Sequence, residues 1–113
     1  MTAGPIRYFL YARKSSENED KQVASVPSQI EELSKLSKEM GLNVTRVFTE
    51  EKSAKGPGRP VFSQMIDDIH KGRAEGIICW KLDRLARNPI DGGTISWMLQ
   101  QSIIRHIQTY QRG

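Results

Sequence analysis

Four short apolar segments alternate with three segments of helical pattern, and this alternation constrains the fold more than any other feature of the chain. The apolar segments, which we expect to be strands, are residues 6–11, 43–49, 75–80 and 103–109. Apolar residues spaced three and four apart predict helices over residues 26–40, 60–69 and from 89 or 90 to 101. Such alternation is typical of an α/β domain with a mainly parallel central sheet of about four strands and helices on both faces.

Capping residues mark the ends of the predicted helices. Ser25 is suited to cap the first helix, with Pro27 near its first turn, and Gly41 ends it. Pro60 begins the second helix, and Gly72 follows its end. Residues 50–59, between the second strand and the second helix, are rich in glycine, proline, serine and lysine and predict a mobile loop.

Composition limits the class of protein. A chain of 113 residues is one domain, long enough to bury about two-thirds of its unfolded surface. Cys79 is the only cysteine and lies in an apolar segment, so a disulfide framework is absent and an intracellular setting is indicated. No stretch approaches the roughly 18 apolar residues of a membrane span, and the start lacks a signal-peptide pattern. We therefore expect a cytoplasmic protein, and its net charge of +4 favours a polyanionic partner.

A basic turn, residues 81–87, follows the third predicted strand. Lys81, Arg84 and Arg87 recur at intervals of three, which places them on one side of a helical turn, while the two leucines of the turn face the other side. Three cations at the end of a strand suit a phosphate. Asp83 lies among them and is able to orient an arginine through a two-point hydrogen bond. If the basic turn is considered alone, the alternative to a phosphate site is a basic surface in contact with solvent.

Polar segments follow the first three predicted strands and should meet at one edge of the sheet. These segments are residues 13–16, 50–52 and 81–84. Successive strand side chains point to opposite faces, so Tyr11, Arg13 and Ser15 point the same way if the strand continues that far. Ser15 is therefore the candidate nucleophile, and a cap of a turn or helix is its ordinary alternative role.

The two histidines are not placed to serve as a base for this serine. His70 falls at the end of a predicted helix and His106 inside the last predicted strand, so a Ser-His-Asp hydrolase is not indicated. Phosphoryl transfer depends more on charge stabilisation and alignment, and neighbouring guanidinium groups favour a serine alkoxide. The arginines that would hold the phosphate oxygens are Arg13, Arg84, Arg87 and Arg59.

Four motifs together resemble the catalytic domain of the serine recombinases, also called the resolvase/invertase family. They are Tyr11-Ala12-Arg13-Lys14-Ser15, Gln29, Gly58-Arg59-Pro60 and Lys81-Leu82-Asp83-Arg84-Leu85-Ala86-Arg87. The last motif is highly specific for this family, and the first is specific when it stands at the end of a first strand. Gln29 and Arg59 are weak indications when each is taken alone. The resemblance runs over nearly the whole chain, and the order and spacing of the motifs carry it.

The resemblance implies site-specific recombination of double-stranded DNA. Ser15 would attack a phosphodiester, keep the 5′ phosphate and release a 3′ hydroxyl, while Arg13, Arg84 and Arg87 hold the phosphate. Asp83 would orient an arginine or assist the leaving oxygen, and Arg59 would close onto the phosphate with its loop. The other expected DNA contacts are Lys81, Gln29, Lys52 and Lys55. No metal and no cofactor is implied, because guanidinium groups supply the charge.

Two departures from the family pattern refine the expectation. The segment of residues 16–25 is longer and more acidic than the corresponding segment of short resolvases, and Lys14 stands where many members have an apolar residue. Both features resemble large serine integrases and transposases of prokaryotes, phages and mobile elements. Family members continue beyond the fourth strand with further sheet, a dimer-forming helix and a DNA-binding region. Residues 1–113 are therefore expected to be a catalytic-domain fragment, inactive alone, of a protein that works as a dimer to tetramer.

Two other functions fit parts of the pattern. In a non-catalytic nucleic-acid-binding α/β module, the same arginines would follow a DNA or RNA backbone and Ser15 would be a cap. In a metal-dependent nuclease, carboxylates would hold the ion. The candidate ligands for that ion are Glu50, Glu51, Asp67, Asp68 and Asp83.

Overall fold

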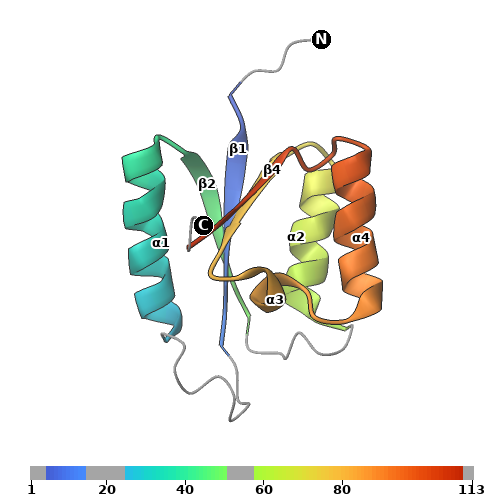
Figure 1. Cartoon of the computed structure of the whole chain (residues 1–113), viewed down its shortest axis with the longest axis horizontal. Coiled ribbons are helices and arrows are strands. Elements are labelled where there is room, and N and C mark those ends of the chain that lie inside the picture. Colours follow the sequence, from blue (N-terminus) through green and yellow to red (C-terminus); the bar gives the residue numbers. More distant parts are fainter. Residues whose placement is uncertain (1–4, 15–24, 51–57, 111–113) are drawn as a thin grey trace.

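A four-stranded parallel sheet forms the centre of the computed structural model, with the strand order β2-β1-β3-β4 (Figure 1). The structure describes residues 5–14, 25–50 and 58–110, and for Asp83 and Arg84 it describes the backbone alone. The strands are β1 (Arg7–Arg13), β2 (Asn43–Glu50), β3 (Gly76–Cys79) and β4 (His106–Thr109). The predicted α/β class and the four strands are confirmed.

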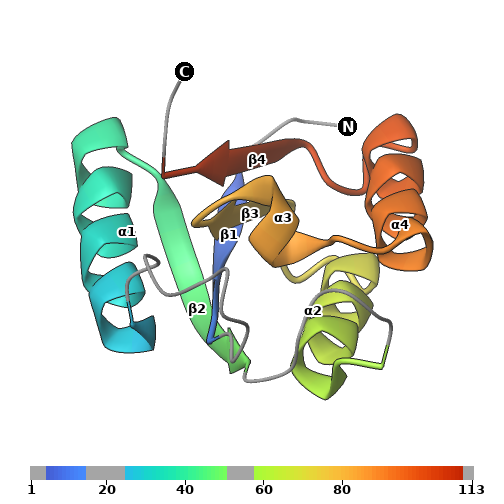
Figure 2. The ribbon, with the colours of Figure 1, turned by 60° about the horizontal axis from the view of Figure 1, so that its bottom comes forward.

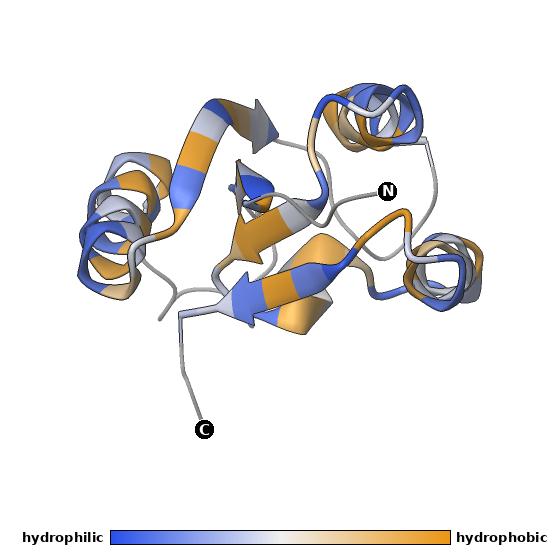
Figure 3. Ribbon diagram, turned by 90° about the horizontal axis from the view of Figure 1, so that it is seen from above, coloured by the Kyte–Doolittle hydropathy of each residue, from blue (hydrophilic) through white to orange (hydrophobic). Residues whose placement is uncertain are grey.

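Helices cover both faces of the sheet, as predicted. The helices are α1 (Val26–Met40), α2 (Pro60–His70), α3 (Leu82–Leu85) and α4 (Pro89–Gln100). Seen from above, the sheet is a layer between α1 on one side and the pair α2 and α4 on the other (Figure 3). The short α3 lies at the carboxyl end of β3 (Figure 2).

The predicted capping residues account for the helix ends. The Ser25 side chain accepts a hydrogen bond from the Ser28 backbone N–H and begins α1. Gly41, with a φ of 70°, ends this helix in the left-handed conformation that glycine adopts without a steric penalty. Pro60 and Pro89 occupy the first turns of α2 and α4, where a missing N–H costs no helical hydrogen bond.

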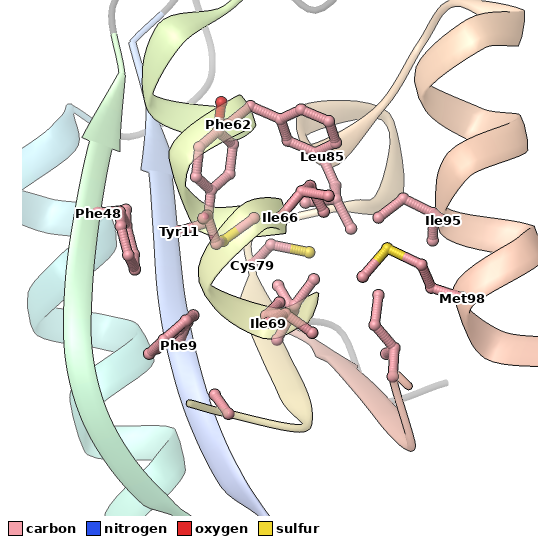
Figure 4. Close-up of a cluster of buried hydrophobic side chains, with 14 residues drawn as sticks. Phe9, Tyr11, Phe48, Phe62, Ile66, Ile69, Cys79, Leu85, Ile95 and Met98 are labelled. Atoms are coloured by element: carbon pink, nitrogen blue, oxygen red, sulfur yellow. The ribbon is translucent and has the colours of Figure 1, made fainter. Parts of the chain in front are cut away.

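Two hydrophobic clusters, one on each face of the sheet, hold the layers together. The cluster beneath α2 and α4 joins strand residues such as Phe9 and Cys79 to Phe62 and Met98 (Figure 4). The cluster beneath α1 contains Leu33 together with Leu10 and Ile78 from the sheet. Strand β1 contributes to both clusters because its side chains alternate between the two faces.

The two leucines of the basic turn differ in burial. Leu85 is 1% exposed and packs in the cluster beneath α2 and α4. Leu82 is 59% exposed, so only one of the two leucines packs in the core. Leu82 is the first residue of α3 and Leu85 the last, and this helix is a single turn of four residues.

Parallel pairing brings three strand ends to one edge, which we call the carboxyl edge of the sheet. Arg13 at the end of β1 pairs with Glu50 at the end of β2. On its other side, Tyr11 of β1 pairs with Cys79 at the end of β3. Within the described residues, no helix has the length and apolar character needed to cross a membrane.

Candidate functional site

Arg13, the last residue of β1, lies at the carboxyl edge. It is 1% exposed, and its Nη1 lies 3.4 Å from the Lys14 carbonyl oxygen, a long hydrogen bond. The Gln29 side chain of α1 donates from Nε2 to the Arg13 carbonyl oxygen at 3.2 Å. Gln29 is also 1% exposed. Its amide therefore supports the end of β1, and the expected contact of Gln29 with DNA remains a prediction.

Three predicted site residues fall outside the described residues. They are Ser15, Lys52 and Lys55. Ser15 follows Arg13, the last residue of β1, by two positions in the sequence. Its role as nucleophile and the DNA contacts of the two lysines remain predictions.

The basic turn begins directly after β3 and contains α3. Its backbone is closed by two hydrogen bonds, from Leu85 N to the Lys81 carbonyl at 3.3 Å and from Ala86 N to the Leu82 carbonyl at 2.9 Å. Lys81 and Arg87 flank α3 and are exposed. Asp83 and Arg84 belong to α3 itself. Burial of Leu85 anchors this turn beside the end of β1, so the sequence prediction that both segments share one edge is confirmed for the backbone.

Arg59 lies inside the domain beneath the basic turn. Its Nη1 donates to the Tyr11 hydroxyl at 3.0 Å, and its Nη2 donates to the Leu85 carbonyl at 2.6 Å. The guanidinium also lies over the Phe62 ring, with its central carbon 4.0 Å from the ring centre. Arg59 is 1% exposed and links β1 to the basic turn in this structure. Its expected contact with a phosphate remains a prediction.

Asp91 completes the surroundings of Arg59, and sequence reasoning missed it. Its Oδ2 accepts from Arg59 Nη2 at 2.9 Å and from Asn88 Nδ2 at 2.8 Å. Asn88 in turn accepts from the Asp91 backbone N–H at 2.9 Å and caps α4. The signal in the sequence was Asn88-Pro89-Ile90-Asp91, a helix-start pattern that gives no sign of a distant arginine.

Glu50 joins β1 to the start of α2. Its Oε1 accepts from the Tyr11 hydroxyl at 3.0 Å and from the Phe62 backbone N–H at 2.7 Å, while Oε2 accepts from Val61 N at 3.2 Å. A carboxylate satisfies the unpaired N–H groups of a helix start and interacts favourably with its dipole. Glu50 therefore fixes the direction in which α2 leaves the carboxyl edge.

Tyr11 is the centre of this buried network. Burial raises the pKa of its phenol far above the ordinary value, the Glu50 carboxylate adds to the rise, and the positive charge of Arg59 opposes it. The hydroxyl therefore stays protonated, donating to Glu50 and accepting from Arg59. It acts as a fixed hydrogen-bonding group of the site and not as a base.

The carboxylates proposed for a metal ion are occupied by other partners. Glu50 accepts backbone and tyrosine hydrogen bonds, Asp67 pairs with Lys71, and Asp68 pairs with Arg46 and Arg73. Among the residues that the structure describes, no three histidine, cysteine, aspartate or glutamate side chains are grouped closely enough to hold a metal ion. Glu51 and the Asp83 side chain lie outside this description.

The sequence pattern of the family described as "Resolvase, N terminal domain" matches residues 8–108. The chain belongs to this family. The resemblance predicted from the motifs is therefore confirmed over nearly the whole domain. No curated protein sequence is significantly similar to the chain.

Solved structures of serine recombinase catalytic domains share the fold of this resolvase-family domain. The N-terminal catalytic domain of TP901-1 integrase is 26% identical, with a TM-score of 0.72 over 94% of this chain and 79% of that chain. The C-terminal catalytic domain of the IS607-like serine recombinase ISC1926 TnpA is 20% identical, with a TM-score of 0.74 over 94% and 68%. A resolvase family site-specific recombinase from Streptococcus pneumoniae is 23% identical, with a TM-score of 0.73 over 96% and 74%.

Proposed function

We propose that this resolvase-family domain cuts and rejoins double-stranded DNA in site-specific recombination, with Ser15 as the nucleophile. The observation that carries the proposal is the convergence of β1 and the basic turn at one edge of the sheet. The segment that contains Ser15 thus leaves the sheet beside the segment that contains Arg84 and Arg87. Serine next to several arginines suits transfer of a phosphoryl group.

The proposed reaction exchanges one phosphodiester bond for another. The Ser15 hydroxyl gives up its proton and its Oγ attacks the phosphorus of the DNA backbone. The bond between phosphorus and the 3′ oxygen breaks, and that oxygen takes up a proton and leaves as a hydroxyl. The 5′ phosphate stays on Ser15 as an ester. Attack by the 3′ hydroxyl of another strand reverses the step, joins the new strands and restores the serine.

Arginines provide the stabilisation of the transition state in this proposal. Arg84 and Arg87 would donate hydrogen bonds to the non-bridging oxygens, and Arg13, which is 1% exposed in this structure, would join them once its side chain is uncovered. Removing one well-aimed donor from such a site typically costs about 3 kcal/mol. Asp83 would orient one of these arginines, and exposed Lys81 would contact the neighbouring backbone of the DNA. These fixed charges take the place of the metal ions used by many nucleases.

Strand exchange implies an assembly. Recombination between two duplexes requires a cut in both strands of each, and each cut needs its own serine. We therefore propose that the full-length protein works as a dimer that pairs into a tetramer on DNA.

The nucleophile is tested by trapping the covalent adduct. The full-length protein is incubated without added metal on a labelled DNA substrate that contains its recombination site, and the adduct is resolved on a denaturing gel. Wild type should form the adduct and Ser15→Ala should form none, because no other group replaces the oxygen. Ser16→Ala is the matched control and should retain the adduct.

The same experiment separates the alternatives. An adduct that persists in Ser15→Ala, or one that is lost in Ser16→Ala alone, would overturn the assignment of the nucleophile. Binding of DNA without any adduct from wild type would favour the non-catalytic module. Cleavage without an adduct that requires a divalent cation would favour the nuclease.

A further inference from the structure

Asp91 is a buried carboxylate beneath the basic turn that the proposed chemistry leaves without a role. It lies in the first turn of α4 and is 8% exposed. An aspartate at this position is ordinarily a solvated residue that interacts with the helix dipole. Here the side chain is 11% exposed, and one carboxylate oxygen accepts from both Arg59 and Asn88. Helix capping alone does not require the contact with Arg59.

The partner of Asp91 links the two halves of the site. Arg59 donates to the carbonyl of Leu85, which belongs to the same short helix as Asp83 and Arg84. It also donates to the hydroxyl of Tyr11, two positions before Arg13 on β1. The position of one guanidinium group therefore sets the position of the basic turn relative to the strand that leads to the serine.

We propose that Asp91 is a positioning residue of the recombination site, on the basis of the function proposed above. It neutralises the Arg59 guanidinium inside the domain and so holds the basic turn against β1. Asp91 touches neither the DNA nor the reacting atoms. Its effect passes through Arg59 to the backbone of α3, whose side chains would hold the phosphate.

Charge explains why a carboxylate is needed at this position. Arg59 is 1% exposed, and its Nε is buried without a hydrogen-bond partner in the described part of the chain. The Leu85 carbonyl and the Tyr11 hydroxyl are neutral acceptors, so Asp91 supplies the only formal negative charge that contacts this guanidinium among the described residues. A buried cation without a counter-charge is unfavourable and moves toward solvent. Without Asp91, Arg59 would leave its place and release the basic turn.

The test is the rate of adduct formation by Asp91→Asn in the full-length protein. Asparagine keeps the shape and removes the charge. At saturating DNA we expect the rate to fall about 10- to 100-fold, as for a small misplacement of reacting groups, while the affinity for DNA stays close to that of wild type. Asp67→Asn is the matched control, because this aspartate pairs with Lys71 on the surface of α2 and its side chain is 57% exposed. Its rate should equal that of wild type.

A double substitution separates positioning from a general loss of structure. If Asp91 acts through Arg59, then Asp91→Asn should lower the rate little further in a protein that already carries Arg59→Ala. Rates are measured at a temperature where circular dichroism shows each variant to be folded. If Asp91→Asn does not fold, Asn88→Ala removes one donor to the same carboxylate oxygen and should show a smaller fall in rate.

The outcomes are distinct from those of the proposed function. Absence of an adduct from wild type would refute the function itself. An adduct that wild type and Asp91→Asn form at equal rates would refute the positioning role alone. A faster rate in Asp91→Asn would also refute it, since Asp91 would then be withholding Arg59 from the phosphate. Equal losses from Asp91→Asn with and without Arg59 would show that Asp91 acts independently of that arginine.

Discussion

The two edges of the sheet carry the same kinds of charged pairs in opposite surroundings. At the carboxyl edge, Arg59 is 1% exposed and pairs with Asp91 beneath the basic turn. At the opposite edge, which we call the amino edge, the Arg46 and Arg73 side chains are 55% and 59% exposed and share Asp68. At the amino edge, both arginine side chains are in contact with solvent. At the carboxyl edge, the Arg59 side chain is shielded from solvent, so the geometry of its pair with Asp91 is fixed by the protein alone.

This difference decides what each edge contributes. A solvated arginine that loses its partner is still hydrated, so at the amino edge only the buried Asp68 carboxylate depends on the pairing. A buried arginine that loses its partner leaves an uncompensated charge in the core. The buried pair is also the one that joins α4, the basic turn and β1 through hydrogen bonds to Leu85 and Tyr11. The buried pair therefore fixes the relative positions of α4, the basic turn and β1 at the carboxyl edge, where the proposed chemistry takes place.

The largest effect on stability is expected from Arg59→Ala. It leaves the Asp91 carboxylate buried without its cation and removes the packing over Phe62, so the free energy of unfolding should fall by about 3–5 kcal/mol. Urea denaturation of the domain measures this. Lys35→Ala, a residue whose side chain is 62% exposed on α1, is the control and should change the value by less than about 0.5 kcal/mol. Similar losses from the two variants would show that burial does not distinguish these charges.

Glu50→Gln should have the next largest effect. The amide keeps the size of the side chain but weakens the hydrogen bonds from Tyr11 and the start of α2, and charge-assisted bonds contribute about 1.5–3 kcal/mol. We expect a loss of stability in that range, measured by the same denaturation. Glu31→Gln, on the exposed surface of α1, should be nearly neutral. A neutral result for Glu50→Gln would mean that the backbone of α2 is held without the carboxylate.

The sequence predicted the order of elements because caps and apolar spacing are local signals. Ser25, Gly41, Pro60 and Pro89 all stand where the helices begin or end. The start of β4 was placed three residues too early, at 103 and not 106. The Ile103 N–H and the Ile104 N–H both bond to the Met98 carbonyl, so these apolar residues close the end of α4 before the strand begins.

The place of the basic turn was predicted because it depends on strand ends, whereas the buried contacts beneath the turn were missed because they depend on packing. The parallel strand order places the basic turn beside Arg13. The sequence predicts this because both motifs stand at the ends of predicted strands. The contact between Arg59 and Asp91 spans 32 positions and exists only because α2 and α4 lie side by side (Figure 1). No local pattern records such a contact. For that reason the contact between Arg59 and Asp91 was not predicted.

The smallest effect concerns the amino edge and depends on pH. Burial of the Asp68 carboxyl would raise its pKa, but hydrogen bonds from Gln64 and Arg73 and the charges of Arg73 and Arg46 outweigh it, so the pKa lies below its ordinary value. A carboxyl whose pKa is lower in the folded than in the unfolded protein stabilises the fold above its unfolded pKa, about 3.9. That stabilisation is lost as the pH falls through the folded pKa.

Asp68→Asn should therefore be less stable than wild type at pH 7, and the difference should shrink as the pH falls below about 4. Urea denaturation at a series of pH values measures it, with Asp67→Asn as the control, because that neighbouring aspartate is 57% exposed. A difference that stays constant from neutral to acid pH would show that asparagine disturbs packing and that the charge of Asp68 contributes nothing. The amino edge would then differ from the carboxyl edge in how its charges act as well as in their exposure.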